Sequence, residues 1–464
     1  MKMRTTYLGV GLTTSLLGVA FVPSIAIAAA KASTCMTRSS ASVAALVRGD
    51  YKSAAKDFAP QMAKQFPPAK IAQAWEAVQA SAGAYQSRGA TEKRDIRGQS
   101  MVVTPVTFAH AEWDFVYGCD DQNRIAAAQL MPVQQLDAAI EASRGEAGSK
   151  APVKAAIEAN GVHVEPLSIS SPFGPLRGAL TLPAGSGPFP AVVLVGGSGP
   201  NDLDEAVGAS KPFRDIANGL AAAGIASLRY DKRQTDYGLK MSANAHLTVD
   251  EEETDDALTA AHLLAKQNGI DPHRVFVLGH SEGGMLAPRM GQRDPELAGV
   301  IMLAAPARKL LTVIREQVRE QGERAGLPKA NIEAQEKSLA DEQTLLDKAD
   351  PKHPPTGSFG GAPQTWWFSL HEYDQVTTAK SLSMPILILQ GGSDFQVSPK
   401  LDFDTWKQAL AGKANVTFHS FPGLGHLFTP AGKTGTVADY AKPAHVDPKV
   451  IAVIANWIKA QPAK

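Results

Sequence analysis

Residues 274–283 read Arg-Val-Phe-Val-Leu-Gly-His-Ser-Glu-Gly, and this stretch decides the fold class. It begins as an apolar run typical of a buried strand and continues into a Gly-x-Ser-x-Gly turn, after which a stretch compatible with a helix follows. Glycines around the serine allow a sharp turn, because they have no Cβ atom. The pattern predicts that Ser281 lies at a strained turn between a strand and a helix, with its hydroxyl clear of the sheet.

Short apolar runs without polar alternation lie on both sides of this turn, and such runs are typical of buried parallel strands. They cover residues 191–195, 225–230, 275–278, 300–304 and 386–389, with helical stretches at 213–223, 254–266 and 285–292. Two earlier runs, 162–169 and 176–182, favour an antiparallel pair. The order predicts an α/β fold with a doubly wound, mostly parallel sheet and helices on both faces. Reactive groups then belong at the carboxyl ends of the strands.

A serine hydroxyl is a poor nucleophile until a base takes its proton, and the base must be oriented by a carboxylate. Asp394 follows the run 386–389 in a tight turn, and His426 lies in the Pro-Gly-Leu-Gly-His loop after the next strand candidate, 416–421. The order Ser281, Asp394, His426 is the chain order of α/β-hydrolases. We therefore predict Ser281 as nucleophile, His426 as base and Asp394 as the acid that orients it.

Other residues could take these roles. His419 alternates with apolar neighbours in a strand, which is typical of a structural histidine, His445 precedes the final helix, and His280 flanks the serine but points away from it. For Asp394 the alternative is a carboxylate that only caps the following helix. Its position before His426, on a neighbouring strand, favours the catalytic interpretation.

The loop after residues 191–195 predicts donors for an oxyanion. It reads Gly-Gly-Ser-Gly-Pro, and α/β-hydrolases take one backbone N–H from this place and the other from the residue after the nucleophile. We assign these donors to Ser198, with Gly197 as its neighbour, and to Glu282. A phosphate-binding glycine loop is the alternative, but the Gly-x-Gly-x-x-Gly spacing is missing and Pro200 interrupts the expected helix.

Residues 307–384 form an insertion far longer than an ordinary connection, where α/β-hydrolases carry a cap. Its first part has apolar residues at helical intervals, and its second part is rich in proline and glycine and contains Trp366 and Trp367. A lid of this kind excludes water and supplies an apolar pocket, so we expect the two tryptophans to line the substrate pocket. The alternative is ordinary packing between cap and core.

The N-terminal 30 residues are typical of a cleaved secretory signal, with Lys2 and Arg4 before an apolar run and small residues near the expected cleavage site. An uncleaved N-terminal anchor is the alternative. No later run approaches the length of a membrane helix, so we expect a secreted or periplasmic mature protein without a membrane span. In that oxidising compartment Cys35 and Cys119 are predicted to form a disulfide; two separate thiols are the alternative.

Composition changes along the chain predict its domain organisation. Residues 31–140 mix helical spacing with strand patterns at 101–108 and 112–117, which predicts a small α+β domain in which we identify no chemistry. A polar, unpatterned linker covers residues 141–157, and residues 158–464 form the α/β domain with the cap insertion.

The overall composition excludes several classes of function. The chain has 464 residues, with 46 Lys and Arg against 46 Asp and Glu, so no net charge attracts nucleic acid. The 2 cysteines are too few for a thiolate zinc site, and the histidine spacings suggest no metal. We expect neither a metal nor a cofactor, while the oligomeric state stays open.

Four motifs together resemble those of secreted bacterial α/β-hydrolase carboxylesterases. They are the Gly-His-Ser-Glu-Gly turn, the Gly-Gly-Ser-Gly-Pro-Asn-Asp loop, residues 229–233 (Arg-Tyr-Asp-Lys-Arg) and the turn that holds Asp394. Relatives usually continue Asp-Lys-Arg with glycine, whereas this chain has Gln234. The region 38–135 resembles the small domain before some of these esterases, which implies a cone of curved sheet and helices like that of nuclear transport factors.

The resemblance and the motifs together predict a serine hydrolase that cleaves small-molecule carboxylic esters through an acyl-enzyme. A peptidase or amidase with the same three residues is one alternative, since the fold serves both. A non-catalytic binding protein that keeps the fold is the other.

Overall fold

The computed structural model describes residues 28–463, apart from 97–98, 110, 121, 133–151, 158–160, 243, 245, 325, 361, 434, 437–438 and 441. The chain divides into two compact units. Unit 1 comprises residues 1–151, 239–246 and 318–365, and unit 2 comprises 152–238, 247–317 and 366–464. The predicted signal peptide lies outside the described residues as far as position 27, as does the predicted linker from 141 to 151.

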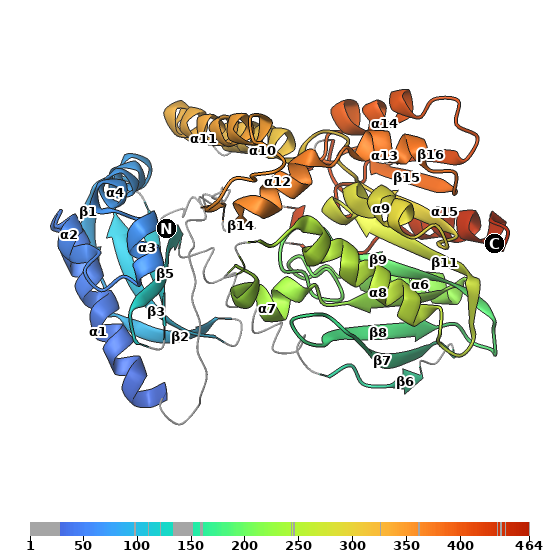
Figure 1. Ribbon diagram of the computed structural model, residues 1–464, viewed down its shortest axis with the longest axis horizontal. Coiled ribbons are helices and arrows are strands. Elements are labelled where there is room, and N and C mark those ends of the chain that lie inside the picture. Colours follow the sequence, from blue (N-terminus) through green and yellow to red (C-terminus); the bar gives the residue numbers. More distant parts are fainter. Residues whose placement is uncertain are drawn as a thin grey trace, which may run out of the picture. The chain divides into compact units, whose positions relative to one another are not determined.

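The N-terminal part of unit 1 is an antiparallel sheet with helices, which confirms the predicted α+β class (Figure 1). The strands pair in the order β1-β3-β4-β5, and β2 pairs with β3. An apolar and aromatic core around Val43, Trp75 and Phe108 joins the sheet to the helices. The elements are α1 (Ala28–Leu46), α2 (Tyr51–Ala54), α3 (Pro60–Gln65), α4 (Pro68–Ala82), β1 (Tyr85–Arg88), β2 (Glu92–Ile96), β3 (Gln99–Phe108), β4 (Glu112–Cys119) and β5 (Ile125–Pro132).

The predicted disulfide is confirmed, since Cys35 in α1 is bonded to Cys119 at the end of β4. The bridge spans 84 positions of sequence and therefore closes most of the N-terminal region into one covalent loop. A disulfide is compatible with an extracellular or periplasmic location. Among the described residues, no helix has the length and apolar character needed to cross a membrane.

Unit 2 contains a nine-stranded sheet in the order β16-β15-β12-β11-β9-β10-β8-β7-β6. The strands from β16 to β10 are parallel, and β8, β7 and β6 add antiparallel pairs at one edge, as the runs 162–169 and 176–182 predict. The strands are β6 (Ala156–Ile157), β7 (His163–Ile169), β8 (Leu176–Leu182), β9 (Phe189–Val195), β10 (Ala226–Tyr230), β11 (Ile270–His280), β12 (Gly299–Leu303), β15 (Ile386–Gly391) and β16 (Val416–Phe421).

Helices cover both faces of this sheet, which confirms the predicted fold class (Figure 1). α6 (Pro212–Ala222) and α15 (Pro448–Ala460) share one core with the face that includes Phe276 and Leu278. Side chains alternate along β11, so Val277 belongs to the other face, against which α8 (Asp255–Leu264) and α9 (Glu282–Arg293) pack. The carboxyl ends of the parallel strands then meet at one edge of the sheet.

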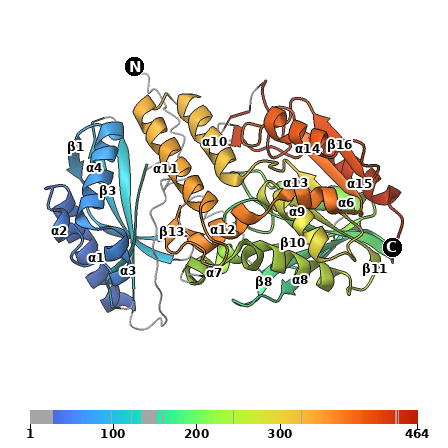
Figure 2. The same cartoon turned by 45° about the horizontal axis from the view of Figure 1, so that its top comes forward.

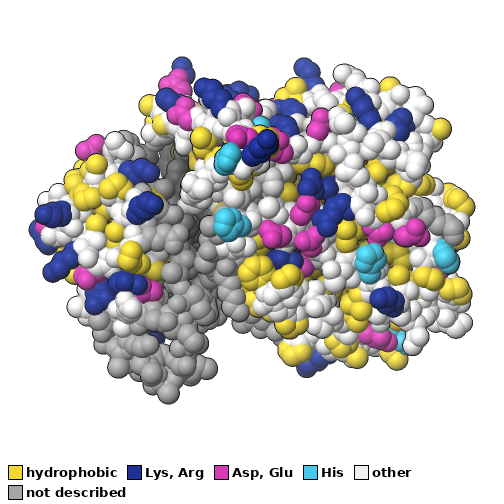
Figure 3. Space-filling model, in the orientation of Figure 1, with side chains coloured by type: hydrophobic (Ala, Val, Ile, Leu, Met, Phe, Trp, Pro, Cys, Tyr) yellow, Lys and Arg dark blue, Asp and Glu magenta, His cyan; other side chains and the backbone are white. Residues whose placement is uncertain are grey.

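Shorter elements connect these layers. The predicted cap insertion is largely helical, and its helices α10 (Leu310–Arg324) and α11 (Lys329–Asp347) pack together, with Arg319 within 3.8 Å of Glu336 (Figure 2). On the face drawn in Figure 3, basic and acidic side chains are interspersed over the described helices. The remaining elements are α7 (Arg233–Ser242), β13 (Ser358–Phe359), β14 (Ala362–Pro363), α12 (Gln364–Glu372), α13 (Gln375–Ser381), α14 (Asp404–Ala409) and the π-helical turns Asp250–Thr254 and Pro399–Phe403.

Candidate active site

Ser281 lies between β11 and α9 in a strained backbone conformation. Its φ of 52° and ψ of −114° fall in a region that residues other than glycine rarely occupy. A Cβ atom on Gly279 would lie 2.0 Å from the carbonyl oxygen of Gly283, and one on Gly283 would lie 2.6 Å from that of Gly196. Glycine is therefore required on both sides of Ser281, because the turn packs backbone against backbone. The Ser281 N–H donates to the carbonyl of Leu303 at 2.8 Å, which ties the turn to β12.

Asp394 and His426 lie within hydrogen-bonding distance, with His426 Nδ1 2.8 Å from Asp394 Oδ2. They follow β15 and β16, two adjacent parallel strands, so their loops lie at the same edge of the sheet. Asp394 Oδ1 accepts the N–H groups of Gln396 at 2.8 Å and Val397 at 2.9 Å, and the Gln390 amide donates to Oδ2 at 2.9 Å. The carboxylate thus stabilises its own turn and faces the imidazole with a fixed orientation.

His280 connects the Ser281 turn to the His426 loop. Its Nε2 lies 2.9 Å from the carbonyl oxygen of His426, and its Nδ1 lies 2.8 Å from Glu205 Oε1. Burial would lower the pKa of His280, but the Glu205 carboxylate raises it above its ordinary value. A protonated imidazole donates from both nitrogens, which both partners can accept. His426 therefore lies beside the residue that precedes Ser281.

The loop after β9 runs directly beside the predicted nucleophile, since a Cβ atom on Gly197 would lie 3.1 Å from that of Ser281. The Gly197 N–H donates to Glu205 Oε1 at 2.6 Å. The Gly197 N–H is thus already bonded to a buried carboxylate, which favours Ser198 as the donor from this loop. Ser198 and Glu282 remain the predicted donors.

Asp231, Lys232 and Thr235, which follow the end of β10, hold this loop in place. Asp231 Oδ1 accepts the N–H of Leu203 at 2.8 Å, and the Lys232 N–H donates to the carbonyl of Asn201 at 3.0 Å. The Thr235 hydroxyl donates to the same carbonyl at 2.8 Å. Each charged residue of the run 229–233 also has an acidic or basic partner: Arg229 with Asp204, Asp231 with Arg177, Lys232 with Glu253, and Arg233 with Asp256.

Three buried glutamates surround the Lys232 ammonium. The carboxylates of Glu252, Glu253 and Glu282 lie within 4.8 Å of one another, a spacing that could hold a metal ion. The ammonium already lies among them, 3.5 Å from Glu252 and 3.6 Å from Glu282, so the cation of this cluster is the lysine itself. Burial raises the pKa of Glu282 to about 7 and that of Glu253 well above its ordinary value, although Lys232 opposes both shifts.

Trp366 and Trp367 are both buried at the start of α12, with their rings edge to face at 4.8 Å. The Trp366 indole N–H donates to the carboxylate of Glu252. This contact joins Trp366 to the Lys232 cluster, as the packing alternative implies. A role for the two tryptophans in a substrate pocket stays a prediction.

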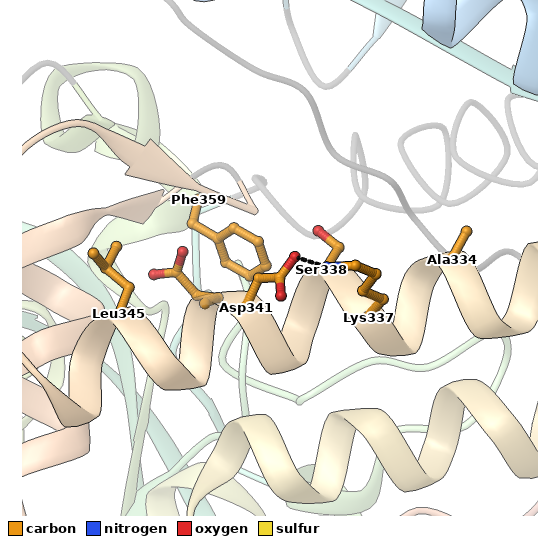
Figure 4. A pocket seen from close by; sticks show the side chains of 7 residues that line it. Ala334, Lys337, Ser338, Asp341, Leu345 and Phe359 are labelled. Carbon is orange, nitrogen blue, oxygen red and sulfur yellow. Dashed lines mark hydrogen bonds and ion pairs between the residues drawn. The ribbon is translucent and has the colours of Figure 1, made fainter.

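A pocket of about 450 Å³ lies along α11 (Figure 4). An ion pair between Lys337 and Asp341, 2.6 Å apart, crosses it. None of the predicted site residues lines it, so it offers no acyl-transfer chemistry. Its lining consists of Ala334, Lys337, Ser338, Asp341, Glu342, Leu345 and Phe359.

Two family models match separate parts of the chain. Residues 207–429 match a family model described as serine aminopeptidase, S33, and they include all three predicted catalytic residues. Unit 2 has the α/β-hydrolase fold. Residues 39–127 match a family described as a protein of unknown function.

The chain is also similar to a curated protein, Esterase EstD from Thermotoga maritima. The two chains are 42% identical over 284 residues, which cover 61% of this chain and 65% of the relative. This chain therefore spans just under two thirds of the relative's length.

Similar solved structures include the esterase domain of a Rhodothermus marinus protein, which is 17% identical with a TM-score of 0.39 and covers 64% of this chain and 98% of that one. Est1E from Butyrivibrio proteoclasticus is 14% identical with a TM-score of 0.39, over 63% of this chain and 96% of that one.

Sequence patterns did not identify the residues that hold the α/β-hydrolase site together. Glu205, His280 and Lys232 lie in quoted motifs or close to them, yet their partners are distant in sequence: His280 and Glu205, for example, are 75 positions apart. The one available signal was the density of charge in residues 201–205 and 229–233, next to strands that are otherwise apolar.

Proposed function

We propose that this protein is a carboxylic ester hydrolase that works through an acyl-enzyme on Ser281. The observation that carries the proposal is the convergence of three loops, in which His426 pairs with Asp394 at 2.8 Å and contacts His280, the neighbour of Ser281. The 42% identity to a curated esterase supports the choice of ester as substrate.

In the proposed mechanism the Ser281 oxygen attacks the ester carbonyl carbon while His426 takes the hydroxyl proton. The Ser198 and Glu282 N–H groups stabilise the oxyanion, and Asp394 stabilises the imidazolium. His426 then gives its proton to the departing alcohol as the C–O bond breaks. A water molecule attacks the acyl-enzyme with His426 again as base, which releases the acid and restores Ser281.

A peptidase or amidase is the second candidate, because the family matched by residues 207–429 is described as a serine aminopeptidase. Both reactions use the same nucleophile and oxyanion site, so the leaving group decides between them.

The test compares 4-nitrophenyl esters of increasing acyl length with aminoacyl 4-nitroanilides, on the wild-type protein and on Ser281→Ala. We expect ester turnover that exceeds anilide turnover and falls by about 10⁴-fold or more in Ser281→Ala. Faster anilide turnover would favour the peptidase, and full ester turnover in Ser281→Ala would reject the nucleophile.

Export to the periplasm or the medium is part of the proposal. The Cys35–Cys119 disulfide supports it, because such bonds persist in oxidising compartments. Recovery of the protein from the cytoplasmic fraction alone, with residues 1–30 still attached, would contradict export.

A further inference from the structure

Lys232 is a buried ammonium that the proposed mechanism does not use. It follows β10 and is 4% exposed, and its Nζ donates to the carbonyl oxygen of Gly197 at 2.8 Å. Burying an ion costs several kcal/mol unless its partners offset that cost. Its position under the loop that carries the predicted oxyanion donor therefore needs an explanation.

The contact to Gly197 fixes one particular peptide group. The Gly197 oxygen also accepts the Asn201 side-chain amide at 2.9 Å, so two donors hold it from the same side of the peptide. Among the described residues the one cis peptide bond is Gly187–Pro188, so the peptide between Gly197 and Ser198 is trans. In a trans peptide the C=O and N–H bonds point in opposite directions. The Ser198 N–H consequently points away from Lys232.

The preceding peptide is held as well, since the Gly197 N–H donates to Glu205 at 2.6 Å. With both peptides around Gly197 fixed, the loop cannot rotate the Ser198 N–H without breaking contacts to buried charges. Preorganised donors of this kind make an oxyanion site effective, because they need no rearrangement during the reaction.

The same ammonium contacts the residue that carries the second predicted donor. Its Nζ lies 3.6 Å from Glu282 Oε1, and Glu282 directly follows Ser281. Burial alone would lower the pKa of Lys232, but the carboxylates of Glu253, Glu252 and Glu282 raise it, so the amine stays protonated. One fixed positive charge thus connects the loop after β9 with the first turn of α9.

We propose that Lys232 is a positioning residue for acyl transfer: by holding the Gly197 carbonyl it orients the Ser198 N–H toward the substrate oxyanion. This inference rests on the proposed ester hydrolysis at Ser281. It requires that loss of the ammonium lowers the kcat of each folded, reactive site. A fall only in the number of folded molecules would not meet this requirement.

Lys232→Met removes the ammonium at similar side-chain length but leaves three buried glutamates without their cation, which can prevent folding. The second variant, Lys232→Met with Glu253→Gln, removes the cation together with its nearest carboxylate. The matched control is Arg233→Met with Asp256→Asn, which removes the neighbouring buried ion pair, whose atoms are 2.6 Å apart.

Reactive sites are counted with a fluorophosphonate probe, from which the Ser281 oxygen displaces fluoride to form a bond to phosphorus. Turnover of a 4-nitrophenyl ester is then expressed per labelled site, and thermal unfolding is followed in parallel. In the charge-matched variant we expect nearly complete labelling, a kcat per site about 10- to 100-fold below wild type and a KM within about threefold, since a misdirected oxyanion donor weakens mainly the transition state. The control pair should keep wild-type kcat per site within about twofold.

Wild-type kcat per labelled site in the charge-matched variant would overturn the inference, as would a loss explained wholly by a rise in KM. Equal loss of kcat per site in the control pair would also overturn it, because the effect would then follow from any lost buried pair. Failure of the probe to label the wild-type protein is a separate result, which rejects the proposed function itself.

Discussion

The N-terminal region and the carboxyl edge of the nine-stranded sheet are stabilised by different interactions. Residues 28–132 have an apolar, aromatic core and one disulfide, and Asp114 is the single buried charged residue among those whose side chains are described there. The sheet edge instead gathers buried charges, with Lys232, Glu252 and Glu282 each no more than 4% exposed. Buried ions are weak evidence for stability, and at this edge they bond backbone groups: Lys232 holds the Gly197 carbonyl and Asp231 the Leu203 N–H.

Asp394→Asn tests the charged side of this comparison with the largest expected effect. The amide can keep the turn but no longer offers two acceptor oxygens to fix and stabilise His426, so we expect kcat/KM for esters to fall by about 10³- to 10⁴-fold. Steady-state kinetics with a 4-nitrophenyl ester measure it. The control is Asp215→Asn, since Asp215 also contacts a histidine at 3.0 Å, but that partner, His445, is 88% exposed. Comparable losses in both variants would contradict the assignment of Asp394.

Removal of the disulfide tests the N-terminal side. Cys35→Ser with Cys119→Ser releases a loop that spans 84 positions, so we expect a loss of about 2–4 kcal/mol in the free energy of unfolding of the N-terminal region. Denaturant unfolding of the full chain measures it. Ester turnover at 25 °C should stay at the wild-type level. A fall of tenfold or more would show that the disulfide also supports the site at the sheet edge, and would contradict the contrast between the two regions.

Glu282→Gln tests the cluster through its pH dependence. The pKa of Glu282 is raised from 4.5 to about 7, so the folded state binds more protons than the unfolded chain between these values. The contribution of Glu282 to stability is fully present below pH 4.5 and is lost as the pH rises through 7. The glutamine variant should therefore gain stability relative to wild type over this range, reaching about 3 kcal/mol at pH 7. Exposed Glu296→Gln is the control, and an equal gain there would reject the explanation.

Trp366→Phe has the smallest expected effect. It leaves a buried carboxylate oxygen of Glu252 without its indole donor, which should cost about 1–2 kcal/mol of stability. Trp406→Phe, which removes an indole bond to the Ala305 carbonyl at 2.9 Å, is the matched control and should cost less, because that acceptor is neutral. A change in acyl-chain preference with unchanged stability would instead assign Trp366 to the substrate pocket.

The parallel sheet could be predicted well from sequence, and the polar N-terminal strands could not. Runs such as residues 386–389 are continuous and apolar because both faces of the strand are buried. Such short apolar runs are typical of buried parallel strands. By contrast, β1 and β2 read Tyr-Gln-Ser-Arg and Glu-Lys-Arg-Asp-Ile, and they are strands because β3 supplies their hydrogen bonds. β5 begins Ile-Ala-Ala-Ala, a composition that also suits a helix.

The residues of the candidate site likewise differ in how well the sequence predicts them. Ser281, Asp394 and His426 each follow a recognisable strand, so local sequence was enough to select them. Glu205 was not selected, because its role depends on a backbone with φ of 50° that brings its carboxylate to Gly197 and His280. Nothing in residues 201–205 alone specifies that geometry.

The anchoring of residues 197–205 has a consequence for protein engineering. Its contacts come from the end of β10, from the residue before Ser281 and from within the loop itself, so a segment grafted from a relative would arrive without the partners that shape it. Libraries aimed at new substrates should keep this segment constant, together with Trp366, which contacts the Lys232 cluster, and should randomise other positions of the predicted cap, residues 307–384.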